Sequence, residues 1–223
     1  MVRMLKRLKK LIMGERVIYP EINRNEKPDA IILAAGMLGK EKLFPKALYE
    51  YAGKTSIEHQ INWLKPFVGK IIIACHQNEF KQIFGHLGNL ENVEYSLETV
   101  LLGTAGAVKR ALEKTNSKSF IICNVDDLTD IDLNALISLG PDTVCVANPR
   151  LNFGVMEIEG FDVIQFREKP LLKNIWASCG VYFICKKTAV GLPERGSLEH
   201  DVWPNTDKLK GFKHFGVWKT FFR

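Results

Sequence analysis

The chain has 223 residues, 46% hydrophobic and 25% charged, a composition typical of a globular protein with a sizeable core. There is no run of about 18 apolar residues, and no apolar stretch follows the basic N-terminus, so we expect neither a membrane-spanning helix nor a signal peptide. The five cysteines are odd in number and lie in or beside apolar runs. This pattern favours buried thiols in the reducing cytoplasm over disulfides or metal ligands.

The formal net charge of +6 is concentrated at the N-terminus. Residues 1–16 place apolar side chains on one face of a helix, with basic residues between them. We therefore divide the chain into a basic amphipathic arm, residues 1–28, and a main domain, residues 29–223. The arm could pack on a protein partner or on the domain itself, or lie on an anionic membrane surface. Nucleic acid is not an expected partner, because no aromatic platform accompanies the basic residues.

The first half of the main domain alternates strands and helices. A continuous apolar run over residues 29–35 ends at Gly36 and predicts a central parallel strand. This alternation predicts a Rossmann-like α/β fold with a doubly wound, mostly parallel sheet. The other expected strands cover residues 70–75, 93–97, 119–124 and 143–147, and the expected helices cover residues 56–67, 77–86, 105–113 and 131–139.

The pattern changes after residue 150. Two short strands, residues 154–158 and 162–166, flank Glu159-Gly160 and predict a hairpin. We expect a further strand over residues 179–185, a helix beginning at residues 198–203 and a final strand over residues 213–218. The sequence thus predicts a mixed sheet in the C-terminal half.

The segment after the first strand is the first candidate site, because ligands of open α/β sheets bind at the carboxyl ends of strands. Residues 36–46 contain two glycines and three lysines. Glycines let backbone N–H groups approach phosphate oxygens, and each charge-assisted contact is worth about 1.5–3 kcal/mol. The segment matches neither G-x-G-x-x-G nor the P-loop pattern. Taken alone, it is either a polyanion-binding loop or a solvated basic loop.

Several segments, in the same order, resemble the motifs of the sugar-1-phosphate nucleotidyltransferases. Residues 31–48 (IILAAGMLGKEKLFPKAL) resemble the L-A-[GA]-G-x-G-T-R signature with its P-K-P element, and residues 102–107 (LGTAGA) match L-G-T-A-G-A. Residues 124–133 resemble N-G-D-x-L-T-D-I-D-L, and residues 153–155 and 168–170 resemble the Y-G-V and E-K-P motifs. The resemblance covers about residues 29–218 and implies a GT-A-like nucleotidyltransferase fold.

The resemblance implies that an NTP reacts with a sugar 1-phosphate or polyol phosphate to give an NDP-sugar and pyrophosphate, with Mg²⁺ as cofactor. Two anions must meet, so positioning and positive charge carry most of the acceleration. Lys40 is expected to hold the β- and γ-phosphates, and Lys46 to bridge the α-phosphate and the attacking phosphate. Asp126 is the expected Mg²⁺ ligand.

Further residues are implied at the two substrates. Gly103 and Thr104 are expected against the base, and Glu98 could read the base edge. Lys169 is expected to neutralise the sugar phosphate while Glu168 hydrogen-bonds sugar hydroxyls. The full set of expected substrate-binding residues is Ala35, Gly36, Glu98, Gly103, Thr104, Gly154, Glu168 and Lys169.

The chain departs from the family pattern at several positions. Leu38 stands where the family has its second glycine. Lys40 stands where the family has arginine, and a lysine keeps the charge but loses the bidentate fork of the guanidinium group. The family often has a second metal-binding aspartate two residues after a tryptophan near the C-terminus. If Trp218 is that tryptophan, Thr220 stands at the position of the aspartate. These departures keep open a non-catalytic or regulatory nucleotide- or sugar-phosphate-binding relative, or a module of a membrane-associated enzyme. The sequence specifies neither base nor sugar, and it leaves the oligomeric state open, a homo-oligomer included.

Overall fold

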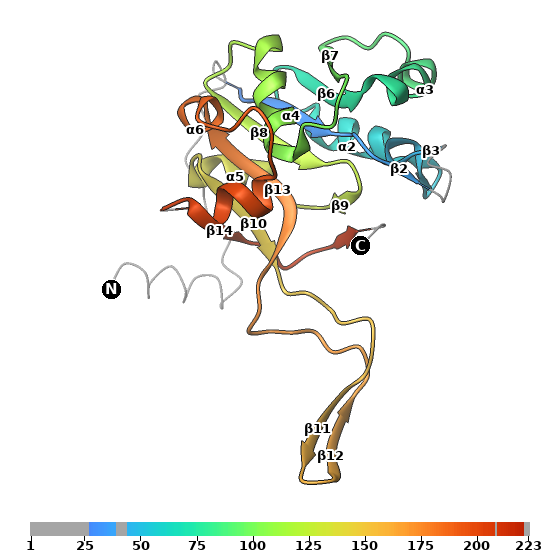
Figure 1. Ribbon diagram of the computed structural model, residues 1–223, viewed down its shortest axis with the longest axis vertical. Coiled ribbons are helices and arrows are strands. Elements are labelled where there is room, and N and C mark those ends of the chain that lie inside the picture. The colour runs from blue at the N-terminus through green and yellow to red at the C-terminus, as the bar shows by residue number, and fades with distance from the viewer. Residues whose placement is uncertain (1–26, 39–43, 208, 221–223) are drawn as a thin grey trace.

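The computed structural model describes residues 27–38, 44–207 and 209–220 (Figure 1). Within them, seven strands form one sheet in the order β14-β10-β13-β8-β1-β6-β7. All neighbouring pairs are parallel except those of β13, which runs antiparallel to β8 and β10. The predicted α/β fold with a mixed C-terminal half is therefore confirmed. The strands are β1 (Asp29–Leu33), β6 (Ile71–His76), β7 (Val93–Glu98), β8 (Ser119–Asn124), β10 (Thr143–Ala147), β13 (Ala177–Cys185) and β14 (Lys210–Lys213).

The central strands are apolar throughout because helices cover both faces of the sheet. Ile32 and Ile73 pack in one core cluster, and Ile31 and Ile72 pack in the other, on the opposite face. Successive strand residues point to opposite faces, so a strand buried on both sides shows no polar alternation. The first cluster is covered by α2 (Ser56–Leu64), α3 (Gln77–Leu87) and α5 (Leu133–Leu139), and the second by α4 (Gly103–Ala111) and α6 (Lys186–Val190).

The expected helix beginning at residues 198–203 forms as a π-helical turn followed by a 3₁₀ turn. The short strands outside the seven-stranded sheet were not expected from the sequence. They pair only two or three residues each, which leaves too little periodicity to detect. The short strands are β2 (Met37–Leu38), β3 (Phe44–Pro45), β4 (Glu50–Tyr51), β5 (Lys54–Thr55), β9 (Asp127–Thr129) and β15 (Trp218–Thr220). The 3₁₀ turns are η1 (Lys46–Leu48), η2 (Leu112–Lys114) and η4 (Trp203–Asn205), and η3 (Leu198–Val202) is a π-helical turn.

The predicted single strand over residues 213–218 is wrong. β14 ends at Lys213 and β15 begins at Trp218, and the chain between them folds around the Asp130 carboxylate. That carboxylate lies 2.9 Å from His214 Nε2 and accepts a 2.7 Å hydrogen bond from the Val217 N–H. Because Asp130 is distant in sequence, the local pattern carried no sign of this interruption.

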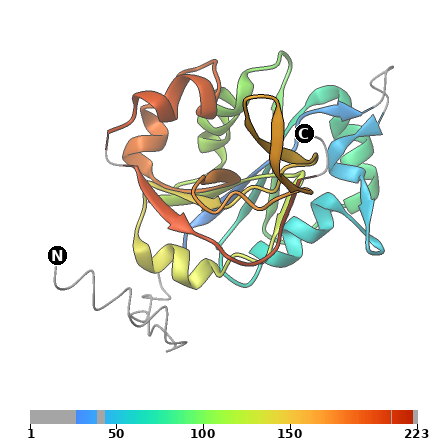
Figure 2. The same cartoon turned by 90° about the horizontal axis from the view of Figure 1, so that it is seen from below.

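The predicted hairpin is confirmed and projects from the body along the long axis of the molecule (Figures 1 and 2). It consists of β11 (Val155–Glu159) and β12 (Asp162–Arg167), joined by Gly160-Phe161, with Gly160 at φ +60. The hairpin lies between β10 and β13 in the sequence, and two long connections link it to the sheet. No helix in the described part of the chain is long and apolar enough to span a bilayer.

Candidate functional site

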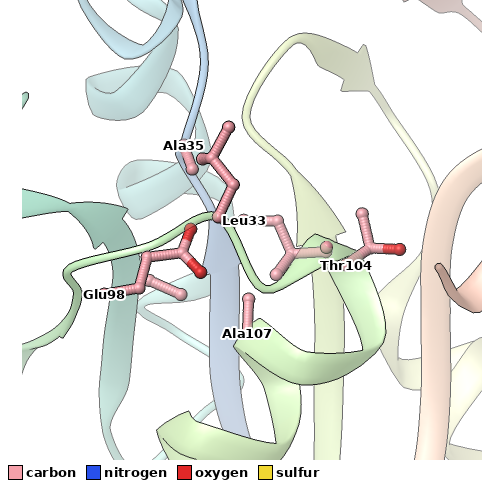
Figure 3. Close-up of a pocket in the computed structure, with 8 residues that line it drawn as sticks. Leu33, Ala35, Glu98, Thr104 and Ala107 are labelled. Carbon is pink, nitrogen blue, oxygen red and sulfur yellow. The ribbon is translucent and has the colours of Figure 1, made fainter. Parts of the chain in front are cut away.

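A cavity of about 200 Å³ opens beside the carboxyl ends of β1, β6 and β7 (Figure 3). Four of the residues expected at the nucleotide line it, namely Ala35, Glu98, Gly103 and Thr104. The other lining residues are Leu33, Ala74, Leu101 and Ala107. The predicted nucleotide-side residues, except Gly36, thus share one apolar hollow at the sheet edge where α/β folds bind ligands.

Gly103 is required by a close backbone approach. Its φ is +76, and a Cβ at this position would lie 2.3 Å from the carbonyl oxygen of Gly196. The same segment holds the turn from both sides: the Gly196 N–H donates to the Leu102 carbonyl, and the Ala105 N–H donates to the Gly196 carbonyl. The cavity wall at Gly103 is therefore clamped to the chain near residue 196.

Glu98 is buried, with 4% of its surface exposed, so it is not a solvent-facing residue at a strand end. Its Oε2 accepts a 3.0 Å hydrogen bond from the Leu102 N–H. Figure 3 shows its carboxylate turned toward β1, at the side of the cavity. A carboxylate fixed in this way is an acceptor-only group in an otherwise apolar hollow.

The second part of the site joins Lys46 to Asp126. Lys46 follows β3, Asp126 follows β8, and the Lys46 Nζ lies 3.2 Å from Asp126 Oδ2 although 80 residues separate them. Their side chains are 29% and 13% exposed, respectively. The pair is thus sheltered from solvent but still reachable by a ligand at the carboxyl edge of the sheet.

Gly36 connects this ion pair to the end of β1. Its carbonyl accepts a hydrogen bond from the Lys46 N–H, and a Cβ on Gly36 would lie 3.2 Å from Lys46 Cδ. The Gly36 N–H donates to Glu79 Oε1 at 2.9 Å. Thus the backbone of Gly36 is held by Glu79 on one side while the Lys46 side chain passes over it on the other.

The family model for nucleotidyl transferases matches residues 30–192. The chain belongs to this family. It is 30% identical over 205 residues to a D-glycero-α-D-manno-heptose 1-phosphate guanylyltransferase of Aneurinibacillus thermoaerophilus, covering 84% of this chain and 88% of that protein. A Campylobacter jejuni protein of the same description is 29% identical over 177 residues, covering 76% of this chain and 75% of that one. The crystal structure of HddC from Yersinia pseudotuberculosis superposes with a TM-score of 0.67 at 23% identity, covering 86% and 93% of the chains, and shares the fold.

The remaining predicted residues of this nucleotidyltransferase lie elsewhere or outside the description. Lys40 and the arm over residues 1–26 lie outside the described residues. Glu168 and Lys169 sit at the root of the β11–β12 hairpin, with side chains 61% and 59% exposed and charged atoms 4.0 Å apart. Gly154 lies beside them, since its Cβ would be 3.1 Å from Glu168 Oε2.

Gly154, Glu168 and Lys169 lie together at the root of the hairpin. Lys169 has φ +44, a left-handed conformation that a lysine rarely adopts, and its carbonyl accepts a 2.8 Å hydrogen bond from Arg150. Non-glycine residues with such strain often cluster at functional positions. The structure therefore brings Lys46 and Asp126 together, and Gly154, Glu168 and Lys169 together, as two separate groups.

Glu199 is a site residue that the sequence analysis missed. Its carboxylate accepts hydrogen bonds from the hydroxyls of Thr104 (2.8 Å), Tyr182 (2.9 Å) and Ser197 (2.9 Å). Burial alone would raise the pKa of Glu199, but these hydrogen bonds together hold it below its ordinary value. An ionised carboxylate therefore orients the Thr104 hydroxyl at the cavity wall.

Glu79, which holds the Gly36 N–H, was also missed. Only 3% of its surface is exposed, and burial raises the pKa of its carboxyl group. In the sequence, both glutamates look like ordinary acidic residues at the start of a helix, which usually stabilise the helix N-terminus. The available signal was their position two or three residues after a turn serine or a strand end, which could not be distinguished from helix capping.

Proposed function

We propose that this chain transfers a guanylyl group from GTP to a sugar 1-phosphate of the heptose class. Membership of the family sets the reaction class, in which an NTP and a sugar phosphate give an NDP-sugar and pyrophosphate. The observation that carries the proposal is the Lys46–Asp126 pair at the sheet edge that also bears the Glu98 cavity.

The chemistry asks mainly for charge and position. An oxygen of the sugar phosphate attacks the α-phosphorus, a new P–O bond forms, and the bond to the β-phosphate oxygen breaks as pyrophosphate leaves. No proton has to move, because the attacking phosphate is already anionic. We infer that the Lys46 ammonium group lies between the two phosphates and reduces their repulsion, and that Lys40 plays the same role toward the departing pyrophosphate.

The residues present fit Mg²⁺ as the cofactor. Mg²⁺ is usually held by one or two carboxylates together with substrate phosphates, and Asp126 offers one partly accessible carboxylate. No group of three or more metal-ligating side chains occurs among the described residues. When bound, Mg²⁺ would neutralise phosphate charge. The Thr220 backbone lies opposite Asp127 in the β15–β9 pair, so the position that would hold the family's second aspartate, if Trp218 is its tryptophan, is close to Asp126.

Glu98 supports guanine as the base. Guanine presents two adjacent donors, its N1–H and its exocyclic amino group, and a carboxylate accepts from both. Uracil and thymine present one N–H between two carbonyl oxygens, which a carboxylate repels. The two heptose 1-phosphate guanylyltransferases among the relatives support the same base and suggest the acceptor sugar.

We assign the sugar side to the hairpin root. Lys169 would neutralise the sugar phosphate, Glu168 would accept hydrogen bonds from sugar hydroxyls, and Gly154 would let the sugar approach the backbone. Buried thiols and nucleotide substrates both support a cytoplasmic setting.

The test is pyrophosphate release from a matrix of five nucleoside triphosphates and a panel containing mannoheptose 1-phosphate, mannose 1-phosphate and glucose 1-phosphate, with Mg²⁺. GTP with the heptose phosphate should react fastest. Lys46→Ala should lose about 10²–10³-fold in kcat, the cost of removing one charge-stabilising donor. Lys54→Ala, at the exposed first residue of β5, is the matched control and should retain activity.

Two further results discriminate the alternatives. Glu98→Gln should weaken the preference for GTP over UTP, because an amide offers one donor and one acceptor. Nucleotide binding without pyrophosphate release from any pair would contradict the proposal and favour a regulatory relative.

A further inference from the structure

The β11–β12 hairpin has one apolar face and one polar face. Met156 pairs with Phe166, and Ile158 pairs with Val163, on the same face of the ribbon. The opposite face carries the pairs Val155–Arg167, Glu157–Gln165 and Glu159–Asp162, so Val155 is the one apolar residue in its pairs. A bulge at Ile164 keeps this separation despite the extra residue on β12. Such a division is typical of a hairpin that buries one face.

Within the described residues, nothing covers that face. The four apolar side chains are between 51% and 61% exposed, Phe153 beside them is 65% exposed, and Phe161 at the tip is fully exposed. With aromatic side chains of about 150–250 Å² each, these six residues expose roughly 700 Å² of apolar surface. That is above the largest patch of a typical monomer, about 300–600 Å², and close to the roughly 800 Å² that each partner gives to a standard interface.

A two-stranded ribbon with an uncovered apolar face is at best marginally stable in water. We therefore expect a surface of similar size to cover the apolar face of the hairpin. The charges of the hairpin indicate the character of that surface. Arg167 pairs with Glu157 at 2.7 Å, so the negative charge of the hairpin is concentrated at its tip, on Glu159 and Asp162. Two tips brought together would repel each other.

The surface at the root of the hairpin has the complementary character. We define the root surface as Leu171, Lys173, Ile175, Trp176, Lys213, Phe215 and Val217. Trp176 and Phe215 lie edge to face with ring centroids 5.7 Å apart, and the Lys213 ammonium group lies 4.7 Å from the Trp176 ring centroid. Its apolar members Leu171, Ile175, Phe215 and Val217 are between 42% and 69% exposed. Residues 210–220 supply three lysines and no acidic residue, and the one carboxylate described against them, that of Asp130, is bonded to the Val217 N–H and lies 2.9 Å from His214.

We propose that a second copy of this chain covers the hairpin, with the acidic, apolar tip of each copy docked on the basic, apolar root surface of the other. Two hairpins lying side by side in opposite directions satisfy this arrangement through a twofold axis. The interface is then self-complementary, since the tip-to-root contact occurs twice. The pairing buries the apolar face of both hairpins and places opposite charges against one another.

The test measures the mass of the full chain in solution by light scattering and sedimentation equilibrium across a dilution series. The wild-type chain should be a dimer. Ile158→Asp, on the apolar face, should weaken the dimer about tenfold or more, as expected for loss of a buried anchor. Gln165→Asp, next to the bulge residue but on the polar face, is the matched control and should leave the dissociation constant unchanged.

Exchanging the charges of the tip and the root surface separates loss of the contact from a folding defect in the hairpin. Replacing Glu159 and Asp162 with lysine should weaken the dimer, and so should replacing Lys173 and Lys213 with glutamate. The chain carrying all four substitutions should recover the dimer, because both contacts regain opposite charges. Failure to recover it, or a wild-type chain that stays monomeric at every concentration, would overturn the proposal.

The N-terminal arm is the competing occupant, since it is basic and amphipathic. Deletion of residues 1–16 should leave the dimer intact if the root surface is the partner. Loss of the dimer, or a monomer in which the hairpin is protected only when the arm is present, would assign the hairpin to the arm instead and refute the dimer contact.

Discussion

Glu199 is expected to contribute to both stability and nucleotide binding. Its carboxylate accepts hydrogen bonds from the hydroxyl groups of Thr104 and Tyr182. In Glu199→Ala, both hydroxyl groups lose this acceptor. A hydrogen bond to a charged group is worth about 1.5–3 kcal/mol, and the several bonds here are not additive, so we expect Glu199→Ala to cost about 2–4 kcal/mol of unfolding free energy. Because Thr104 lines the cavity, the KM for the nucleotide should rise more than kcat falls.

The pH dependence of that stability has a definite sign. Hydrogen bonds hold the pKa of folded Glu199 below its ordinary value, so its contribution is fully present above the unfolded pKa. It is lost as the pH falls through the lower, folded pKa. Urea unfolding at neutral and acidic pH should therefore show a wild-type advantage over Glu199→Ala that shrinks toward low pH.

Glu194→Ala is the matched control. Its carboxylate is 88% exposed and lies 3.7 Å from Lys109, so its removal should change stability by less than about 0.5 kcal/mol. A double-mutant cycle with Tyr182→Phe should show coupling between Tyr182 and Glu199. If Glu199→Ala proves as stable as Glu194→Ala and binds nucleotide normally, the proposed orientation of Thr104 is wrong.

Three further predictions concern a glycine, a buried glutamate and the cysteines. Gly103→Ala should destabilise the protein by about 2 kcal/mol or more and raise the nucleotide KM, because the new Cβ meets the Gly196 carbonyl and φ is +76; a thermal melt and initial-rate kinetics check this. Glu79→Ala should raise the nucleotide KM by leaving the Gly36 N–H without its acceptor, whereas Glu79→Gln, which keeps an oxygen there, should raise it less. Burial raises the pKa of the Cys75 thiol to about 12, so mass spectrometry after alkylation at pH 8 should find Cys75 unmodified until the chain unfolds, with half-buried Cys185 reacting first.

Much of the site was predictable because the family's motifs follow the strands. The loop after β1, the turn before α4 and the aspartate after β8 all lie where the chain leaves the sheet, so their approximate location follows from strand prediction alone. The reaction class followed from the ordered motifs and is confirmed by the family match. The individual roles of Lys46, Asp126, Glu98 and Lys169 remain predictions, to be decided by the substitutions above.

The sequence by itself determined the strands and helices whose burial is periodic. β8 and β10 lie at the predicted residues. A short continuous apolar run such as SFIICN predicts a strand buried on both faces, because its apolar side chains point to both sides of the sheet. Local patterns also identified the hairpin, although its turn lies at Gly160-Phe161, one residue later than predicted, because Glu159 still pairs with Asp162.

Only the tertiary structure decided which distant groups meet. The Lys46 Nζ and Asp126 Oδ2 atoms lie 3.2 Å apart although 80 residues separate them in the sequence. The Asp130 carboxylate interrupts the strand that the local sequence of residues 213–218 predicts. Glu79 and Glu199 became site residues through partners far along the chain. The physical reason is that propensity and burial act locally, whereas a hydrogen bond or ion pair depends on where the folded sheet brings two segments together. For the same reason, the local pattern predicted the two strands of the hairpin but not that the rest of the described chain would leave their apolar side chains exposed.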